Sequence, residues 1–293
     1  MLQNNEIIIF IQGFRSEVLD GFFIAVSFIL DAPMLMLLFA IIYWCVDKKY
    51  SVVFVISFFI GSILNGLVKI IVQAPRPGDP QIAILYGDST KETYSFPSGH
   101  SQYASSLAAG ISLRTYKSNM KQKWVLYSGS VFIALLGGFA RLYLGVHYLE
   151  DVIAGLVIGV VIILILIWAI SKINNELWFI IFLIPLYIIM IFQHDHSLYG
   201  FVGILTAIIA GFIIEKRYIN MQYAKSRKIS IMRVICGFPP ALGLYSIRYF
   251  LLANVHIAID YFIMFAIGAY LVLLMPLVFA KLKYFSETAI SME

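Results

Sequence analysis

Long apolar segments alternate with short polar turns along nearly the whole chain. Most of these segments approach the roughly 20 residues that a helix needs to cross the hydrocarbon core of a bilayer. A helix satisfies its own backbone hydrogen bonds, so apolar segments of this length cross membranes as helices. The pattern predicts an all-α, polytopic transmembrane helical bundle with about nine spans, at about 19–46, 50–73, 98–116, 124–142, 148–170, 177–193, 199–215, 231–252 and 259–280.

Two features depart from this regular pattern. Residues 5–14 are apolar but too short to span, and we expect a short amphipathic helix that lies in the headgroup region. The first span contains Asp31-Ala32-Pro33, and a proline inside a helical segment predicts a kink. We therefore divide the chain into a surface segment (1–18), a helical core (19–171) and an extension of about four further spans (172–293).

The composition agrees with a membrane protein. Of 293 residues, 61% are hydrophobic and only 13% are charged, and the mean hydropathy of +0.90 lies outside the range of soluble globular domains. The N-terminus has no basic region before the first apolar segment, so we expect no cleavable signal peptide. The two cysteines imply neither a disulfide nor a metal site.

The positions of lysine and arginine predict the orientation in the membrane. If the turn at 47–49 lies in the cytoplasm, most of the 21 lysines and arginines fall on inner loops or inner span ends, as the positive-inside rule requires. The N-terminus then lies outside and the C-terminus lies in the cytoplasm. The cations that remain outside or within spans are Arg15, Lys69, Arg76, Lys91, Arg141 and Arg248.

Three polar stretches lie at the outer face in this topology. They occupy residues 69–77, 94–100 and 141–151. Together they contain cations, hydroxyls, two imidazoles and a carboxylate, in a chain with few charges elsewhere. The residues with candidate chemistry are Lys69, Arg76, Ser98, Gly99, His100, Arg141, His147 and Asp151.

This set of side chains suits a phosphate ester. A phosphate monoester carries about two negative charges, and its transfer is catalysed mainly by positioning and by charge stabilisation. Lys69, Arg76 and Arg141 supply positive charge. Ser98 adds a hydroxyl donor at a predicted helix start, where free backbone N–H groups favour an anion and Gly99 permits close approach.

The two histidines suit different steps of phosphoryl transfer. His147 is the candidate nucleophile, and Asp151, one helical turn later, holds its ring in the attacking tautomer. His100 is the candidate general acid, which protonates the leaving alkoxide and then activates water. These roles need no metal and no cofactor.

Taken singly, several of these residues also fit structural roles. Lys69 fits an interfacial anchor, and Arg76 fits a helix cap. His147 and Asp151 fit a structural pair. Arg141 fits a structural role less well, because a charge inside a membrane is costly and usually marks a site.

Other polar residues give weaker signals. His194-Asp195-His196 fits a solvated loop better than a metal site. Arg248 fits either an anchor or a headgroup contact. The basic run at 216–233 predicts an anchor on anionic lipid rather than a nucleic-acid site.

The order Lys-x6-Arg-Pro, then Pro-Ser-Gly-His, then Arg-x5-His-x3-Asp resembles the signature of the type 2 phosphatidic acid phosphatase (PAP2) superfamily. The match covers about residues 50–170. The resemblance implies that the five residues Lys69, Arg76, Ser98, Gly99 and Arg141 bind phosphate, that His100 is the acid and base, and that His147 is the nucleophile with Asp151 as its partner. Ala140 occupies the place of a serine in that signature.

The sequence therefore predicts a metal-independent hydrolase in the plasma membrane. It removes a terminal phosphate from a lipid phosphate or diphosphate at the extracytoplasmic face, through a phosphohistidine. Phosphatidic acid, phosphatidylglycerophosphate, a sphingoid phosphate and undecaprenyl pyrophosphate all present such a phosphate. The alternatives are an anion or lipid-phosphate transporter, a non-enzymatic lipid-binding protein, and a haloperoxidase, which shares the signature but suits a membrane-embedded site less well.

The orientation can be tested by cysteine labelling. We expect an engineered cysteine in the loop at 78–96 to react with an impermeant thiol reagent added outside intact cells. Labelling that appears only after the cells are permeabilised contradicts the orientation.

Overall fold

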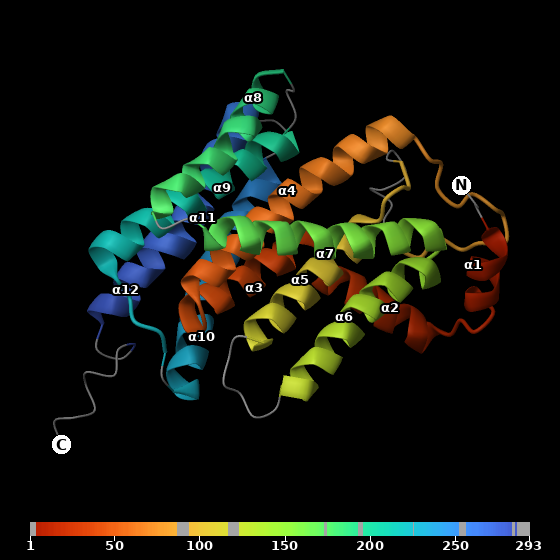
Figure 1. The fold of residues 1–293 in the computed structure, drawn as a ribbon, viewed down its shortest axis with the longest axis horizontal. Coiled ribbons are helices and arrows are strands. Elements are labelled where there is room, and N and C mark those ends of the chain that lie inside the picture. Colours follow the sequence, from red (N-terminus) through yellow and green to blue (C-terminus); the bar gives the residue numbers. More distant parts are fainter. Residues whose placement is uncertain are drawn as a thin grey trace. The chain divides into compact units, whose positions relative to one another are not determined.

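A computed structural model of the chain describes residues 4–86, 94–116, 123–172, 175–192, 196–224, 226–251, 256–282 and 285 (Figure 1). Every regular element within these residues is a helix, which confirms the predicted all-α class.

Within the described residues, six helices are long and apolar enough to cross a membrane, so the chain is a multi-pass membrane protein. A seventh crossing is added if the bent pair α2 (Glu17–Ile29) and α3 (Ala32–Cys45) forms one span. The six are α4 (Lys48–Val72), α6 (Lys123–Tyr143), α7 (Leu149–Ser171), α9 (His196–Ile214) continued by η3 (Glu215–Ile219), α10 (Arg227–Leu251), and α11 (Ile257–Ala269) continued by η5 (Tyr270–Leu274) and α12 (Met275–Lys281).

The count of nine stays a prediction. The expected span at 98–116 forms α5 (Gly99–Tyr116), whose many serines, alanines and glycines leave it less apolar than the six spans above. The expected span at 177–193 forms the shorter pair η2 (Glu176–Leu183) and α8 (Ile184–Phe192).

The kink predicted near Pro33 is confirmed. Helices α2 and α3 meet at an angle of 59°. Pro33 lies in the first turn of α3, where its missing N–H costs no hydrogen bond. Asp31 lies at the break itself, and its backbone carbonyl accepts a hydrogen bond from Leu35 N (3.0 Å).

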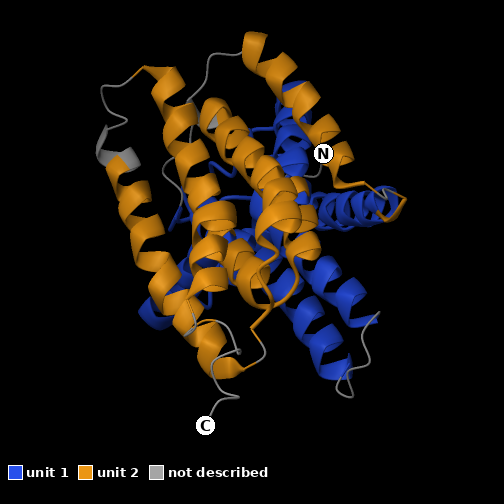
Figure 2. Cartoon of the chain, turned by 90° about the vertical axis from the view of Figure 1, so that its left-hand side faces the viewer, with its two compact units in different colours: residues 1–35, 57–170 blue, residues 36–56, 171–293 orange. Residues whose placement is uncertain are grey.

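The chain divides into two compact units (Figure 2). The first consists of residues 1–35 and 57–170, and the second of residues 36–56 and 171–293. The sequence-based division at residues 18 and 171 stays a prediction. All eight candidate residues belong to the first unit.

In the first unit, small residues let helix α7 approach the start of α5 closely. A Cβ atom added at Gly155 would lie 2.3 Å from Ser98 O, and one added at Gly159 would lie 2.2 Å from Gln102 O. Only glycine fits such short separations. The N-terminal turns of α5 and α7 are therefore held together, which brings residues 98–100 close to residues 147–151.

The helix α1 (Asn5–Gln12) is anchored to the protein by its last residue. The side-chain amide of Gln12 donates to Ala83 O (2.8 Å) and to Tyr143 O (2.9 Å), and its oxygen accepts from Ala83 N (2.9 Å). Ile8 is fully buried. This helix therefore covers the loop that follows Pro77 and the C-terminal end of α6, in addition to any contact with headgroups.

The second unit has a polar interior of its own. Lys48 Nζ donates to Glu215 Oε1 (2.6 Å) and to a backbone carbonyl, and both side chains are buried. Arg233, which we expected within a surface-exposed basic run, is also buried. Its guanidinium donates to the carbonyls of Trp44, Gln222 and Phe285, which accounts for the difference from the expectation.

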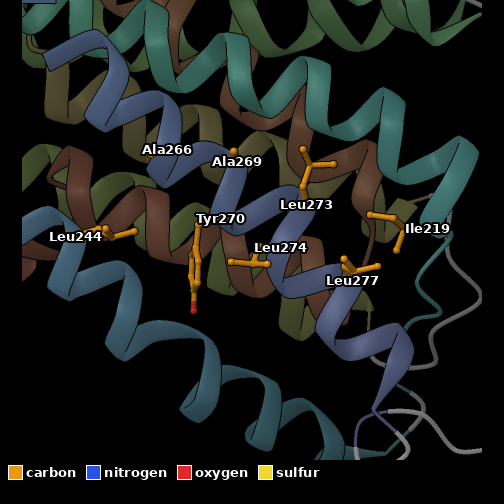
Figure 3. A pocket seen from close by; sticks show the side chains of 8 residues that line it. All are labelled: Ile219, Leu244, Ala266, Ala269, Tyr270, Leu273, Leu274 and Leu277. Carbon is orange, nitrogen blue, oxygen red and sulfur yellow. The ribbon is translucent and has the colours of Figure 1, made fainter. Parts of the chain in front are cut away.

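An apolar groove of about 460 Å³ opens on this second unit (Figure 3). Its one polar lining group, the Tyr270 hydroxyl, donates to Gly237 O (3.0 Å) and is therefore satisfied. The lining residues are Ile219, Leu244, Ala266, Ala269, Tyr270, Leu273, Leu274 and Leu277.

Candidate active site

The centre of the site is the imidazole of His147, in the short connection between α6 and α7. His147 Nδ1 lies 3.3 Å from Asp151 Oδ2, and Arg76 Nη1 lies 3.4 Å from His147 Nε2. A guanidinium can only donate hydrogen bonds, so Nε2 accepts and carries the lone pair. The proton then sits on Nδ1 and is donated to Asp151. The contact between His147 and Asp151 agrees with their four-residue spacing, and the role of His147 as a nucleophile stays a prediction.

Asp151 connects several parts of the site. Besides His147, its Oδ2 accepts hydrogen bonds from the Ser95 hydroxyl and from Tyr148 N (2.9 Å), and its backbone carbonyl accepts from Ser98 N (3.0 Å). Asp151 is buried. Its Oδ1 has no hydrogen-bond partner among the described residues.

Lys69 and Arg76 hold the chain segment that precedes α5. Lys69 Nζ donates to the carbonyls of Tyr94 and Ser95 (3.0 Å for Ser95), and Arg76 Nη2 donates to Tyr94 O (3.4 Å). Arg76 Nη1 also donates to Val146 O (2.8 Å). The two cations are therefore fixed on backbone carbonyls beside His147 and keep their charge within the site.

Arg141 is buried at the C-terminal end of α6, with only 1% of its surface exposed. Its Nη1 donates to the Ser27 hydroxyl (2.9 Å), and its Nε has no hydrogen-bond partner among the described residues. A buried donor without a partner is costly. A ligand that accepts this hydrogen bond would remove the cost.

The start of α5 supplies Ser98, Gly99 and His100. Gly99 is the first residue of the helix. The Ser98 hydroxyl is fully buried and accepts hydrogen bonds from Ser101 N (3.4 Å) and Ser101 Oγ (2.9 Å). In this arrangement the Ser98 hydroxyl caps the helix, and its contact with phosphate stays a prediction.

His100 has a partner that the sequence did not indicate. His100 Nε2 lies 2.8 Å from Asp31 Oδ1, and the Tyr86 hydroxyl donates to the other carboxylate oxygen of Asp31. We interpreted Asp31 only as an interruption of the first span. An isolated carboxylate inside an apolar segment is itself a signal of a site, because a charge there is expensive.

Ser95 and Ser27 are two further contacts that the sequence did not indicate. Ser95 lies within a stretch already singled out, three residues before Ser98. Ser27 lies on α2, far from the motifs in sequence, and no local pattern marks it. Both hydroxyls act on charged groups of the site, since Ser95 contacts Asp151 and Ser27 contacts Arg141.

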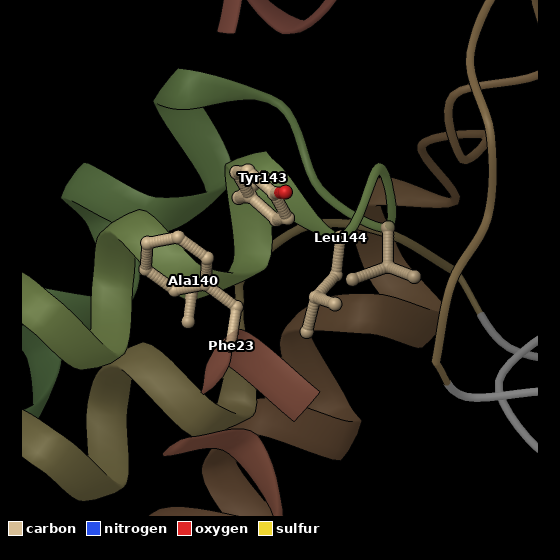
Figure 4. Close-up of a cluster of buried hydrophobic side chains, with 5 residues drawn as sticks. Phe23, Ala140, Tyr143 and Leu144 are labelled. Carbon is tan, nitrogen blue, oxygen red and sulfur yellow. The ribbon is translucent and has the colours of Figure 1, made fainter. Parts of the chain in front are cut away.

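Ala140 lies in an apolar cluster with Phe23, Tyr143 and Leu144 (Figure 4). The ring of Phe23 stands beside Ala140, and Ala140 is fully buried. The missing serine of the PAP2 signature therefore corresponds to a position packed against apolar side chains. A hydroxyl reaches the neighbouring Arg141 from α2 instead, through Ser27.

Some predicted residues lie outside the described part of the chain. These are Lys91 in the loop and His194 and Asp195 of the weak metal candidate; the side chain of Arg248 is also not described. Among the described residues there is no group of three or more histidine, cysteine, aspartate or glutamate side chains that could hold a metal ion.

The electrostatic environment of His147 follows from burial among cations. Burial lowers the pKa of His147 well below the ordinary histidine value, and the charges of Arg141, Arg76 and Lys69 lower it further. Because a lowered pKa favours the neutral ring, one ring nitrogen of His147 keeps its lone pair at neutral pH.

The geometry can be compared with known proteins. Residues 50–175 match the family model of the PAP2 superfamily, and residues 199–287 match a model described as a PAP2 superfamily phosphatase transmembrane extension. The chain is 30% identical over 153 residues to phosphatidylglycerophosphatase B of Bacillus subtilis, a match that covers 50% of this chain and 71% of that protein. The chain therefore belongs to the PAP2 superfamily.

Two further comparisons agree. The chain is 27% identical over 165 residues to lipid phosphate phosphatase delta of Arabidopsis thaliana, covering 53% of this chain and 39% of that protein. The crystal structure of a transmembrane PAP2-type phosphatidylglycerolphosphate phosphatase from Bacillus subtilis has the same fold over 57% of this chain and 84% of that one, with a TM-score of 0.50 and 23% identity. The chain spans about half the length of most curated relatives that it matches.

The pKa of His147 predicts the pH dependence of a reaction at this site. As the pH falls through the lowered pKa, Nε2 becomes protonated and loses the lone pair that attacks. We expect the acidic limb of kcat/KM, which reports the free enzyme, to lie below the ordinary histidine pKa.

The substrate must be titrated separately, because a phosphate monoester gains its own proton at about pH 6. The substrate pKa is measured by phosphorus NMR. The effect of this titration on the pH profile of kcat/KM is subtracted, and the remaining acidic limb is assigned to the enzyme. An enzyme limb at or above the ordinary histidine pKa contradicts the description of His147.

Proposed function

We propose that this protein hydrolyses the terminal phosphate of a membrane lipid phosphate or diphosphate, without a metal and through a phosphohistidine. The observation that carries the proposal is His147, a buried neutral imidazole with its Nε2 lone pair beside Arg76 and its Nδ1 proton on Asp151. This arrangement suits attack on a phosphorus atom that the cations hold next to Nε2.

In the first step, His147 Nε2 attacks phosphorus and the bond from phosphorus to the leaving oxygen breaks. Positive charge that develops on the ring is shared with Asp151 through Nδ1–H. His100 gives a proton to the leaving oxygen, so that the lipid departs as an alcohol. In the second step, His100 takes a proton from water while the water oxygen bonds to phosphorus and releases His147.

Positive charge for these steps comes from Lys69, Arg76 and Arg141. The unpartnered Nε of Arg141 favours an incoming phosphate oxygen, because such a contact satisfies a buried donor. Lys69 and Arg76 are already ordered on backbone carbonyls, so little side-chain freedom is lost when they bind. The N-terminus of α5 at Gly99 favours an anion through its helix dipole and the Gly99 backbone N–H, whereas the Ser98 N–H is already donated to Asp151 O.

The substrate class is a lipid with a phosphate or diphosphate headgroup. Support comes from the membrane spans and from relatives whose names denote a lipid phosphate phosphatase and a phosphatidylglycerophosphatase. The positive-inside pattern supports a site on the extracytoplasmic face of the plasma membrane. A transporter of anions needs the cations but gives no role to a His147–Asp151 pair, and the site therefore favours an enzyme.

Metal removal tests the source of the positive charge. We expect purified protein in detergent to keep its phosphatase activity in EDTA, because side chains offset the phosphate charge. Vanadate, which forms a trigonal-bipyramidal adduct like the transition state, is expected to inhibit. Activity that is lost in EDTA and restored by a divalent ion points instead to a metal-assisted site.

The two histidines are expected to differ in their dependence on the leaving group. His147→Ala should abolish turnover and any trapped phosphoenzyme, whatever the leaving group. His100→Ala should be nearly inactive toward an alkyl phosphate, whose leaving oxygen needs a proton. With an activated aryl phosphate it should still form phosphoenzyme, which then accumulates because the water step also needs His100.

The measurement is the time course of phenol release from the aryl phosphate. We expect His100→Ala to show a burst followed by slow turnover, and we expect Asp151→Asn to reduce the rate of the burst. The assignment of the two histidines is reversed if His147→Ala still forms phosphoenzyme while His100→Ala shows no burst with either leaving group.

A further inference from the structure

The break between α2 and α3 reaches the candidate active site at two points. Asp31 lies at the break and contacts His100, and Ser27, four residues earlier, contacts Arg141. Ser27 lies on α2, and Asp31 lies in the break that follows it. This short segment therefore contacts both the candidate acid and a candidate phosphate-binding cation.

The Asp31 carboxylate is held by two partners from different parts of the chain. Oδ1 lies 2.8 Å from His100 Nε2, and Oδ2 accepts the hydrogen bond of the Tyr86 hydroxyl. Burial and the neighbouring Asp31 raise the pKa of Tyr86 to about 12, so the hydroxyl stays protonated and donates. Both carboxylate oxygens thus have donors, which fixes the plane of the carboxylate relative to the His100 ring.

The charges around His100 are mainly positive. Burial of the His100 ring and the charges of Arg141 and Arg76 all oppose a positive charge on that ring. Asp31 is the one carboxylate hydrogen-bonded to His100 among the described residues, and its negative charge counteracts the effect of the two arginines on the His100 ring. A general acid must carry a proton before it can give one away, so His100 needs this negative charge.

We propose that Asp31, held by Tyr86, is a positioning residue that orients His100 and enables it to carry the proton for the leaving group. This inference rests on the proposed phosphatase function. Asp31 keeps one proton of His100 on Nε2, so Nδ1 is the nitrogen that exchanges protons. Nδ1–H passes its proton to the leaving oxygen as the P–O bond breaks, and Nδ1 then accepts a proton from the attacking water.

If the contact between Asp31 and His100 were only a structural ion pair at the helix break, its loss would slow all substrates equally. Substrates with good and poor leaving groups therefore distinguish this role from the proposed one. Asp31→Asn keeps the shape of the side chain but removes its charge. We expect kcat toward a short-chain phosphatidic acid to fall about 100-fold, within the range that general acid catalysis contributes. For p-nitrophenyl phosphate, whose leaving group needs no proton, the rate of the phenol burst should fall less than about threefold.

Asp20→Asn is the matched control, because it makes the same substitution at an aspartate of α2, the helix that precedes the break. Among the described residues, the Asp20 carboxylate is hydrogen-bonded to Arg15 and Tyr143 and to none of the candidate site residues. We expect it to leave the ratio of the two substrate rates unchanged. Tyr86→Phe keeps the carboxylate but removes its second donor, and it should show the same preference for the aryl substrate as Asp31→Asn, to a smaller extent.

The outcomes separate this inference from the proposed function. If the wild-type protein releases no phosphate, or if His147→Ala retains wild-type activity, the proposed function fails and the inference fails with it. If the wild-type protein is active but Asp31→Asn matches it, or slows both substrates equally, only the role of Asp31 is overturned. Should Asp31→Asn fail to fold, Tyr86→Phe decides: an unchanged substrate ratio in that variant overturns the inference.

Discussion

The hydrogen bonds of the buried Asp151 carboxylate are the interaction on which the site depends. Its Oδ2 contacts Ser95, His147 and the Tyr148 backbone, and its own carbonyl contacts Ser98 N. Stretches that are about fifty residues apart in sequence are thereby joined at one residue. Removing the carboxylate would free the His147 ring and the Ser95 hydroxyl, whereas the backbone bond to Ser98 would remain. One residue thus holds both the imidazole and the start of α5.

The hydrogen bonds of the three cations at the site support the proposed anionic ligand. Lys69 and Arg76 bond to backbone carbonyls, and Arg141 bonds to a neutral serine. Two carboxylates of the site, Asp31 and Asp151, are each hydrogen-bonded to a histidine. Buried or half-buried cations attract an anion strongly, because the surrounding dielectric is low. We propose that a doubly charged phosphate is this anion.

The helix α5 shows how a polar segment can be accommodated among membrane-spanning helices. Its Ser101, Gln102 and Ser106 side chains are buried, and Asn65 donates to Gln102 Oε1 (2.9 Å) while Ser106 donates to Gly159 O (2.9 Å). The glycines of α7 allow the contact that these hydrogen bonds need. A helix that begins at the candidate site can therefore remain polar along its buried side, and hydropathy alone understates how deeply its side chains are buried.

The sequence by itself determined the helical class, the multi-pass character and the kink near Pro33, and it supplied the candidate residues of the site, whose roles stay predictions. Each depends on local information: the length of apolar runs, the backbone of proline, or the spacing between His147 and Asp151. The contacts of Asp31 with His100, Ser27 with Arg141 and Gln12 with the loop at Ala83 were decided only by the tertiary structure. They join residues about 70 to 114 positions apart. Which face of a bent helix turns toward a site depends on packing, and packing leaves no periodic signal in one sequence.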